Sequence, residues 1–149
     1  MKARRYQVRK EAASIIEGGH PWIFREQLSS AASIFADGDW LRLVDGQNRV
    51  IGHGIFEAEG AIAIRVLRTG AEPPDAAWLR ATLRTALSRR TSLAAAATTG
   101  IRLVHGESDA IPAVVVDRFG DTLVVSSYSS GADALARYIA AALVAEARG

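Results

Sequence analysis

The sequence contains no cysteine among its 149 residues. Without thiols the chain can form no disulfide, offer no thiolate to zinc and supply no thiol nucleophile. It also lacks any run of about 18 consecutive apolar residues, so no membrane-spanning helix is expected. The basic start is followed by Arg9, Lys10 and Glu11 instead of an apolar segment, so no secretion signal is predicted. These absences are typical of a cytoplasmic protein.

Positive charge is concentrated in two places. The formal net charge is only +2, which is too small to indicate nucleic-acid binding by itself. However, residues 1–10 hold five cations and no acid, and residues 76–100 hold four arginines and no acid. Such clusters are compatible with phosphate contacts, and a solvated surface explains them about equally well.

The clearest boundary in the chain contains the paired prolines Pro73 and Pro74. Prolines remove backbone donors and disfavour the helical region for the residue before them, so the chain is expected to pause here. We predict a first domain over residues 1–70, a linker over residues 71–75 and a second domain over residues 76–149.

The first domain has a mostly β pattern. One short helix is expected over residues 10–18, and five short strands are expected at residues 6–8, 20–24, 40–44, 50–56 and 61–67. Many short strands with one small helix predict a small β-barrel that protects its strand edges by closure.

After the linker the pattern changes to α/β. Leucines recur every four residues from Leu79, which predicts a single helix over residues 76–96. A last helix is expected after a Ser130 cap. Three short strands are predicted at residues 101–104, 113–116 and 122–126, with a loop at 106–112 and a turn at 117–121. Three strands expose two edges, so we expect a partial α/β domain with a short sheet and two helices, continued in the native protein.

Three closely spaced glycines could be taken for a cofactor-binding loop, but their positions argue against one. Gly52, Gly54 and Gly60 lie within or beside predicted strands, and no helix follows them. A phosphate-binding loop needs glycines that open directly into a helix, so bulges or tight bends are the better interpretation.

One acidic segment resembles a metal-ligand pattern. On an extended strand His105, Glu107 and Asp109 would share a face that could hold a divalent ion. Gly106 and Ser108 predict a loop instead, which favours loop caps or a surface ion pair. No nucleophile has a recognisable elbow either, so the sequence predicts no catalytic, cofactor-binding or metal-binding residue.

Two stretches resemble a known family. The first runs from Gly19-His20-Pro21-Trp22-Ile23-Phe24 through residues 38–45 and 52–56 to Ile64-Arg65-Val66-Leu67. It is similar to the N-terminal PUA domain of the PUA-containing ribosomal-RNA cytosine-C5 methyltransferases, a class I SAM-dependent family. The second covers residues 102–121 and resembles the segment R-L-V-x-G-E-S-D-G-L-P-G-L-x-V-D-R-Y-G-D that opens the central domain of that family.

Two residues depart from the family pattern. Ala110 and Ala113 stand where the family usually has glycine. Glycine permits positive φ or a close backbone approach, so alanine puts a fine function of this loop in doubt without affecting the fold.

The resemblance implies an RNA-recognising barrel joined to the first part of a central domain. In that family a Rossmann-like catalytic domain follows, with the SAM-binding glycines and a nucleophilic cysteine. This chain would therefore be inactive alone, and S-adenosylmethionine is expected only in the full-length parent. The implied partners are structured RNA, most naturally ribosomal RNA, and the absent catalytic domain.

The resemblance also suggests roles for particular residues. The implied RNA contacts are cations of the first domain, namely Arg4, Arg5, Arg9, Lys10, Arg25, Arg42 and Arg65. The loop of Glu107, Ser108 and Asp109 is expected at the interface with the catalytic domain, because its carboxylates repel phosphate. Two alternatives remain open. One is a stand-alone RNA-binding or adaptor protein, and the other is an oligomerisation module that pairs with a copy of itself, as a homodimer, through its open sheet edge and the apolar face of its last helix.

Overall fold

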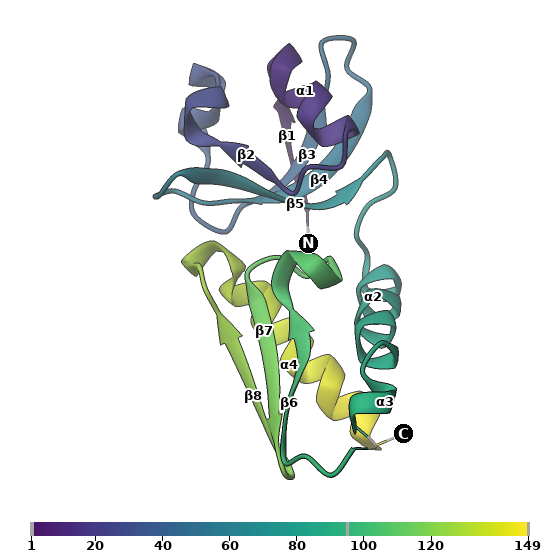
Figure 1. Cartoon of the computed structure of the whole chain (residues 1–149). Coiled ribbons are helices and arrows are strands. Elements are labelled where there is room, and N and C mark those ends of the chain that lie inside the picture. Colours follow the sequence, from purple (N-terminus) through teal and green to yellow (C-terminus); the bar gives the residue numbers. More distant parts are fainter. Residues whose placement is uncertain (1, 95, 149) are drawn as a thin grey trace. The chain divides into compact units, whose positions relative to one another are not determined.

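The computed structural model describes residues 2–94 and 96–148 of the chain. The chain divides into two compact units, residues 1–74 and residues 75–149, and each has a sheet of its own (Figure 1). The predicted mixed class, with a β-rich N-terminal part and an α/β part after it, is confirmed.

The N-terminal unit is built on a five-stranded mixed sheet. Its elements are β1 (Arg4–Gln7), α1 (Lys10–Glu17), β2 (Trp22–Phe24), β3 (Trp40–Val44), β4 (Val50–Phe56) and β5 (Ile62–Thr69), with 3-10 turns at Arg25–Gln27 and Ser30–Ile34. The strand order is β1-β3-β4-β5-β2. The β1–β3 pair is parallel and the other pairs are antiparallel. The end strands β1 and β2 do not pair with one another in the described residues, so hydrogen bonds do not close the barrel.

Helix α1 supplies part of the core of this unit. Its buried residues Ala12, Ala13 and Ile16 follow the helical period, which places them on one face. They belong to a cluster in which the rings of Tyr6 and Phe35 meet edge to face at 5.5 Å. The helix ends at Gly18, as the sequence predicts.

The sheet is tight at Gly54. A Cβ atom there would lie 2.7 Å from the carbonyl oxygen of Arg65 and 2.8 Å from Cγ2 of Ile64. The register of the β4–β5 pair also shifts between His53 and Gly54. A bulge with a close backbone approach explains this glycine, as predicted.

The C-terminal unit combines a three-stranded antiparallel sheet with helices. Its elements are α2 (Ala76–Ser88), α3 (Thr91–Ala94), β6 (Gly100–His105), β7 (Val114–Phe119), β8 (Thr122–Ser127) and α4 (Asp133–Arg148), with 3-10 turns at Gly106–Asp109 and Ser130–Ala132. The strand order is β6-β7-β8. Helix α2 contacts β6 and α4 contacts β8, and Leu83, Leu135 and Ile139 are fully buried. None of the helices in the described residues is both long and apolar enough to span a membrane.

The prediction of one helix over residues 76–96 is wrong. Helix α2 ends at Ser88, and α3 is a separate turn of helix. The hydroxyls of Ser88 and Thr91 donate to the carbonyl oxygens of Thr85 and Ser88, and such bonds compete with the helical pattern. The guanidinium of Arg90 is also held by Asp109, which fixes the break.

Two boundaries after β6 also differ from the prediction. Strand β7 continues to Phe119, so the predicted turn at 117–121 is limited to residues 120–121. Asp117 stays in the strand, where it accepts two hydrogen bonds from Arg102 on β6. Ser130, the predicted cap of the last helix, instead begins a 3-10 turn that leads into α4, and this turn is capped by Ser129, whose hydroxyl accepts from the N–H of Ala132.

Ala110 and Ala113 adopt the left-handed conformation, with φ of 56° and 57°. The substitution of alanine for glycine therefore leaves the loop geometry intact. A side chain makes this conformation costly, by about 1–2 kcal/mol per residue, so other contacts must hold the loop in place.

We expect Ala110→Gly to raise the free energy of unfolding of the C-terminal unit by about 0.5–1 kcal/mol. Relief of left-handed strain exceeds the extra freedom that glycine gains in the unfolded chain. Urea denaturation measures the change. The control Ala141→Gly, at an exposed position of α4, should lower stability by about 1 kcal/mol. A loss in both variants would contradict the strain.

Gly54→Ala should lower the free energy of unfolding of the N-terminal unit by about 1–3 kcal/mol, because the added methyl group meets backbone and core atoms. Thermal unfolding followed by circular dichroism provides the measurement. Gly46→Ala is the matched control: its Cβ would meet nothing within 4 Å, and we expect a change within about 0.5 kcal/mol. Equal stability of the two variants would show that β4 and β5 do not approach so closely.

Candidate nucleic-acid interface

A groove of about 730 Å³ opens on the N-terminal unit. Its walls come from the start of α1, with Arg9, Lys10 and Ser14, and from the turn between β3 and β4, with Gln47 and Arg49. Because β1 and β3 are parallel, the residues that follow them lie at the same edge of the sheet. This pairing brings residues 7–10 beside residues 45–49.

The β3–β4 turn is organised by Asp45. One oxygen of its buried carboxylate accepts from the N–H groups of Gln47 and Arg49, each at 2.9 Å. The other accepts from Nε of Arg49 at 2.7 Å. The backbone hydrogen bond from Arg49 is the largest cause that lowers the pKa of Asp45, and it outweighs desolvation, which raises it. The acid is therefore balanced within the turn.

The cations at the groove differ in their partners. Arg9 and Lys10 are exposed, and no hydrogen bond or ion pair of their side chains is found within the described residues. Arg5 donates from Nε to the side-chain oxygen of Asn48 at 2.8 Å, which ties β1 to the turn. Glu17 is the other acid in the groove lining, so Arg9 and Lys10 leave the groove with positive charge.

Three of the predicted RNA contacts have internal roles. Arg65 pairs with Glu57 at 2.9 Å, and their side chains are only 13% and 6% exposed. Arg25 donates to the carbonyl oxygen of Glu57, and Arg4 pairs with Asp39. Contact with RNA stays a prediction for all seven cations, but phosphate would have to compete with these partners. Arg9, Lys10 and Arg42 are better placed, because their side chains have no such partners in the described residues.

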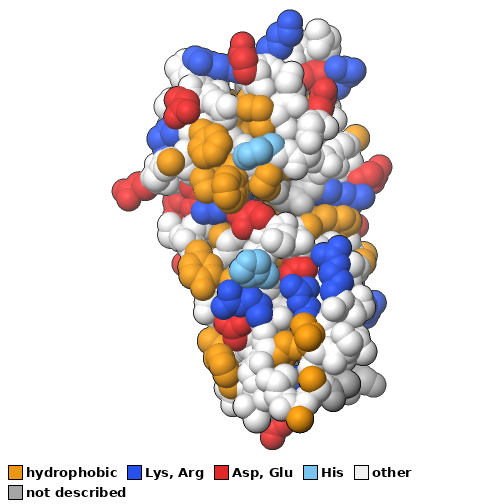
Figure 2. Space-filling view, viewed as in Figure 1, with side chains coloured by type: hydrophobic (Ala, Val, Ile, Leu, Met, Phe, Trp, Pro, Cys, Tyr) orange, Lys and Arg blue, Asp and Glu red, His pale blue; other side chains and the backbone are white. Residues whose placement is uncertain are grey.

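Aromatic side chains gather on another part of the N-terminal unit. Trp22 and Phe24 on β2 are half-buried, and their rings lie 6.3 Å apart. The ring of His20 lies 5.9 Å from that of Trp22. Figure 2 shows hydrophobic side chains collected beside a histidine on this unit. The rings of His20, Trp22 and Phe24 therefore form one aromatic cluster.

The predicted interdomain loop is an internal junction of the C-terminal unit. Asp109 accepts from two nitrogens of Arg90, each at 2.7 Å, from Arg89 at 3.2 Å and from the N–H of His105 at 2.7 Å. Desolvation by burial raises the pKa of Asp109, but the Arg90 hydrogen bond and the other contacts outweigh it, so the pKa is lowered. Asp109 therefore joins the end of α2 to the end of β6.

This network leaves no metal-ligand geometry at the loop. The described residues contain no group of three or more histidine, aspartate or glutamate side chains placed to hold a metal ion. The Nδ1 atom of His105 lies 3.3 Å from Nη1 of Arg102, and Asp109 is occupied by arginines. An interface role for Glu107, Ser108 and Asp109 stays a prediction.

Sequence reasoning missed two features of this interface. Nothing in the pattern shows that β1 pairs with β3 in parallel, so the groove could not be assembled from the sequence. The turn at residues 45–48 was recognisable, but Gln47 and Arg49 gave no sign that they lie beside Arg9 and Lys10.

Comparison with known proteins places these features in context. A model of the PUA-like domain matches residues 7–69. The chain is 33% identical over 132 residues to a ribosomal RNA large subunit methyltransferase of Deinococcus radiodurans, which covers 85% of this chain and 32% of that protein. It is 34% identical over 116 residues to ribosomal RNA large subunit methyltransferase I of Salmonella arizonae, which covers 76% of this chain and 29% of that protein.

Solved structures share the fold. A protein of Streptococcus mutans assigned to the SAM-dependent methyltransferases superposes with a TM-score of 0.79, and a methyltransferase structure in complex with SAH superposes with a TM-score of 0.80. Each is 16% identical to this chain in sequence. Each alignment covers 93% of this chain and 36% of the other protein.

The chain therefore carries a PUA-like domain and is homologous to ribosomal RNA large subunit methyltransferases. It spans about a third of the length of the curated relatives it matches. The resemblance recognised in the sequence is confirmed to this extent.

Asp109→Asn should lower the free energy of unfolding of the C-terminal unit by about 3 kcal/mol, because Arg90, only 15% exposed, would lose the charge that balances it. Urea denaturation at neutral pH measures the change. The control Glu146→Gln removes one partner of the Arg84–Glu146 pair, in which Arg84 is 64% exposed. We expect a much smaller loss there, because solvent screens an exposed pair. Similar losses in both variants would contradict the special role of Asp109.

Proposed function

We propose that this chain is the RNA-recognising portion of a ribosomal RNA large subunit methyltransferase, and that its groove binds RNA phosphates. The observation that carries the proposal is the pair of unengaged cations, Arg9 and Lys10, at a groove within the PUA-like match. The homologues named for action on large subunit ribosomal RNA supply the class of nucleic acid.

The groove suits phosphate for a second reason. Helix α1 begins at Lys10, and its N-cap residue Arg9 makes no side-chain capping bond. The first N–H groups of a helix lack partners within the helix, and the helix dipole favours an anion there. A phosphate near this end would meet backbone donors and two exposed cations together. Both elements depend on shape and charge and not on base sequence, in keeping with recognition of structured RNA.

Methyl transfer would depend on the rest of the parent protein. For transfer to cytosine C5, which the family resemblance implies, a cysteine thiolate attacks C6 of the base, and this chain contains no cysteine. The proposal therefore assigns S-adenosylmethionine and the nucleophile to the catalytic domain of the parent. Residues 76–149 would be the first part of the central domain, with Glu107, Ser108 and Asp109 facing the catalytic domain.

The proposal predicts salt-dependent RNA binding that depends on the groove. The double variant Arg9→Gln/Lys10→Gln should bind large-subunit ribosomal RNA transcribed in vitro more weakly than the wild type. The slope of log K against log salt concentration should fall by about 1–2, because each lost phosphate contact removes about one unit. Filter binding at several salt concentrations measures both quantities.

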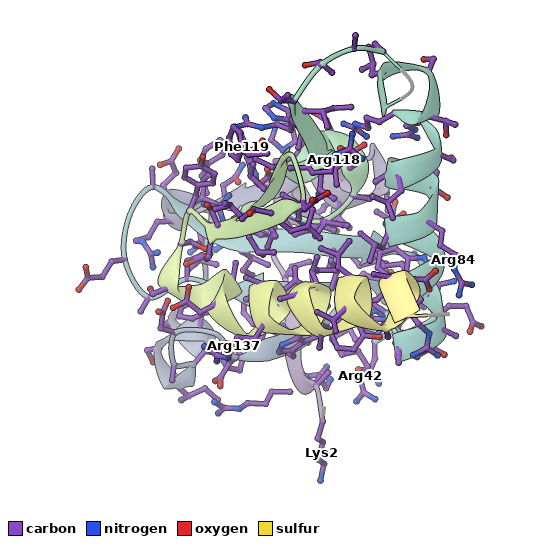
Figure 3. All side chains as sticks on the ribbon, turned by 90° about the horizontal axis from the view of Figure 1, so that it is seen from below. Lys2, Arg42, Arg84, Arg118, Phe119 and Arg137 are labelled. Carbon is purple, nitrogen blue, oxygen red and sulfur yellow. The ribbon has the colours of Figure 1, made fainter. Side chains whose placement is uncertain are left out.

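Arg137→Gln is the matched control for this experiment. Arg137 is an exposed arginine of α4 with no side-chain partner in the described residues (Figure 3). Its replacement removes one positive charge from the C-terminal unit, and we expect little change. Equal losses per charge removed in the control and the groove variant would mean that RNA responds only to overall charge, and the groove would lose its role.

A further inference from the structure

A row of basic side chains crosses the sheet of the N-terminal unit. The strand register places Arg5 opposite Arg42, Arg42 opposite His53, and His53 opposite Arg68. Directly opposed residues project from the same face of a sheet. Successive members come from β1, β3, β4 and β5, which are neighbours about 4.8 Å apart. The four side chains therefore form one continuous line.

This line lies on the face opposite the helix-covered core. The residues on either side of Arg42, Leu41 and Leu43, belong to the core cluster under α1, so Arg42 points the other way. Arg42 is exposed, and its side chain has no hydrogen bond or ion pair in the described residues. Figure 3 shows that Arg42 and Lys2 project from the same side of this unit.

The charges that lower the pKa of His53 are both positive. Its side chain is 4% exposed, and burial is the largest cause that lowers its pKa, followed by the positive charges of Arg42 and Arg68. All three effects oppose protonation of the imidazole. The row therefore places a neutral histidine between two arginines.

A buried ring nitrogen of this histidine lacks a partner. Nδ1 of His53 is buried and accepts or donates no hydrogen bond within the described residues. A buried N–H without a partner is costlier than a bare acceptor, so the proton belongs on Nε2. The Nε2–H group is then a neutral donor between two cations. An anionic oxygen is the partner that this set of donors fits.

We propose that the row formed by Arg5, Arg42, His53 and Arg68 is a second phosphate-binding site for RNA. Arg42 forms the ion pair and the Nε2–H of His53 donates a hydrogen bond. Arg68 contributes mainly charge, because its Nη1 donates to the carbonyl oxygen of Pro73 at 2.8 Å. The inference rests on the proposed function and extends it beyond the groove.

Arg5 connects the row to the groove. It opposes Arg42 across the parallel β1–β3 pair, and its Nε donates to Asn48 in the turn beside the groove. An RNA strand bound at Arg9 and Lys10 can thus continue past Arg5 onto the sheet face. Its successive phosphates would then meet the cations of the row.

The test compares single and double charge removals in the full chain. Arg42→Gln should weaken binding to transcribed large-subunit ribosomal RNA by about tenfold, as expected for loss of a hydrogen-bonded charge, and reduce the salt slope by about 1. Arg137→Gln, which removes the same charge from α4, should leave both quantities unchanged. Circular dichroism verifies that the variants are folded.

The outcomes separate the row from the groove. If Arg42→Gln behaves like Arg137→Gln while Arg9→Gln/Lys10→Gln loses affinity, the row is overturned and the groove stands. If only Arg42→Gln loses affinity, the row stands and the groove is overturned. A wild type without salt-dependent RNA binding overturns both.

Nuclear magnetic resonance of the histidine rings tests the role of His53 without a substitution in the core. The nitrogen shifts of the free chain should show a neutral ring with the proton on Nε2, and RNA should move the His53 resonances. Inorganic phosphate alone should move them much less, because it makes a single contact. An equal response to inorganic phosphate would mean that the row binds free anions and is not specific for RNA. No response of the His53 resonances to RNA would overturn the role assigned to His53.

Discussion

The parallel pairing of β1 with β3 is the constraint on which both proposed binding features depend. Parallel neighbours end at the same edge of a sheet, so the chain after β1 meets the turn after β3, and the groove forms between them. The same pairing sets Arg5 opposite Arg42. A slip of one residue would turn every side chain of β1 to the other face, and Tyr6 would leave the core.

Charge is distributed unequally over the N-terminal unit. Arg25 and Arg65 are drawn inward and stabilise the region around Glu57 through hydrogen bonds and an ion pair. Arg9, Lys10 and Arg42 have no such partners in the described part of the chain. A small net charge therefore conceals positive local surfaces, because Asp39, Asp45 and Glu57 are paired with other arginines. Composition alone does not reveal this division, since it depends on which strands are neighbours.

Local patterns predicted much of the fold. The helix at Lys10 and the bounds of β3 and β4 followed from periodicity and turn residues, and the bulge at Gly54 followed from its place in a strand. Predictions failed where distant residues decided the outcome. The helix after the linker stops at Ser88 because Arg90 is held by Asp109, nineteen positions further along. Similarly, the sequence predicts Arg65 as a surface cation, but the structure pairs it with Glu57. The sequence also does not indicate that His53 lies between Arg42 and Arg68.

The loop after β6 keeps a left-handed backbone conformation at two positions that are not glycine. Ala110 and Ala113 keep the left-handed geometry that glycine adopts readily, because the carboxylate of Asp109 and its arginine partners hold the adjoining turn from outside. The loop conformation is thus stabilised by the ion pair of Asp109 with Arg90 and not by the backbone preference of residues 110 and 113. Loss of Asp109 or Arg90 alone would therefore remove this support, whereas glycine at position 110 or 113 would keep the backbone shape without the strain.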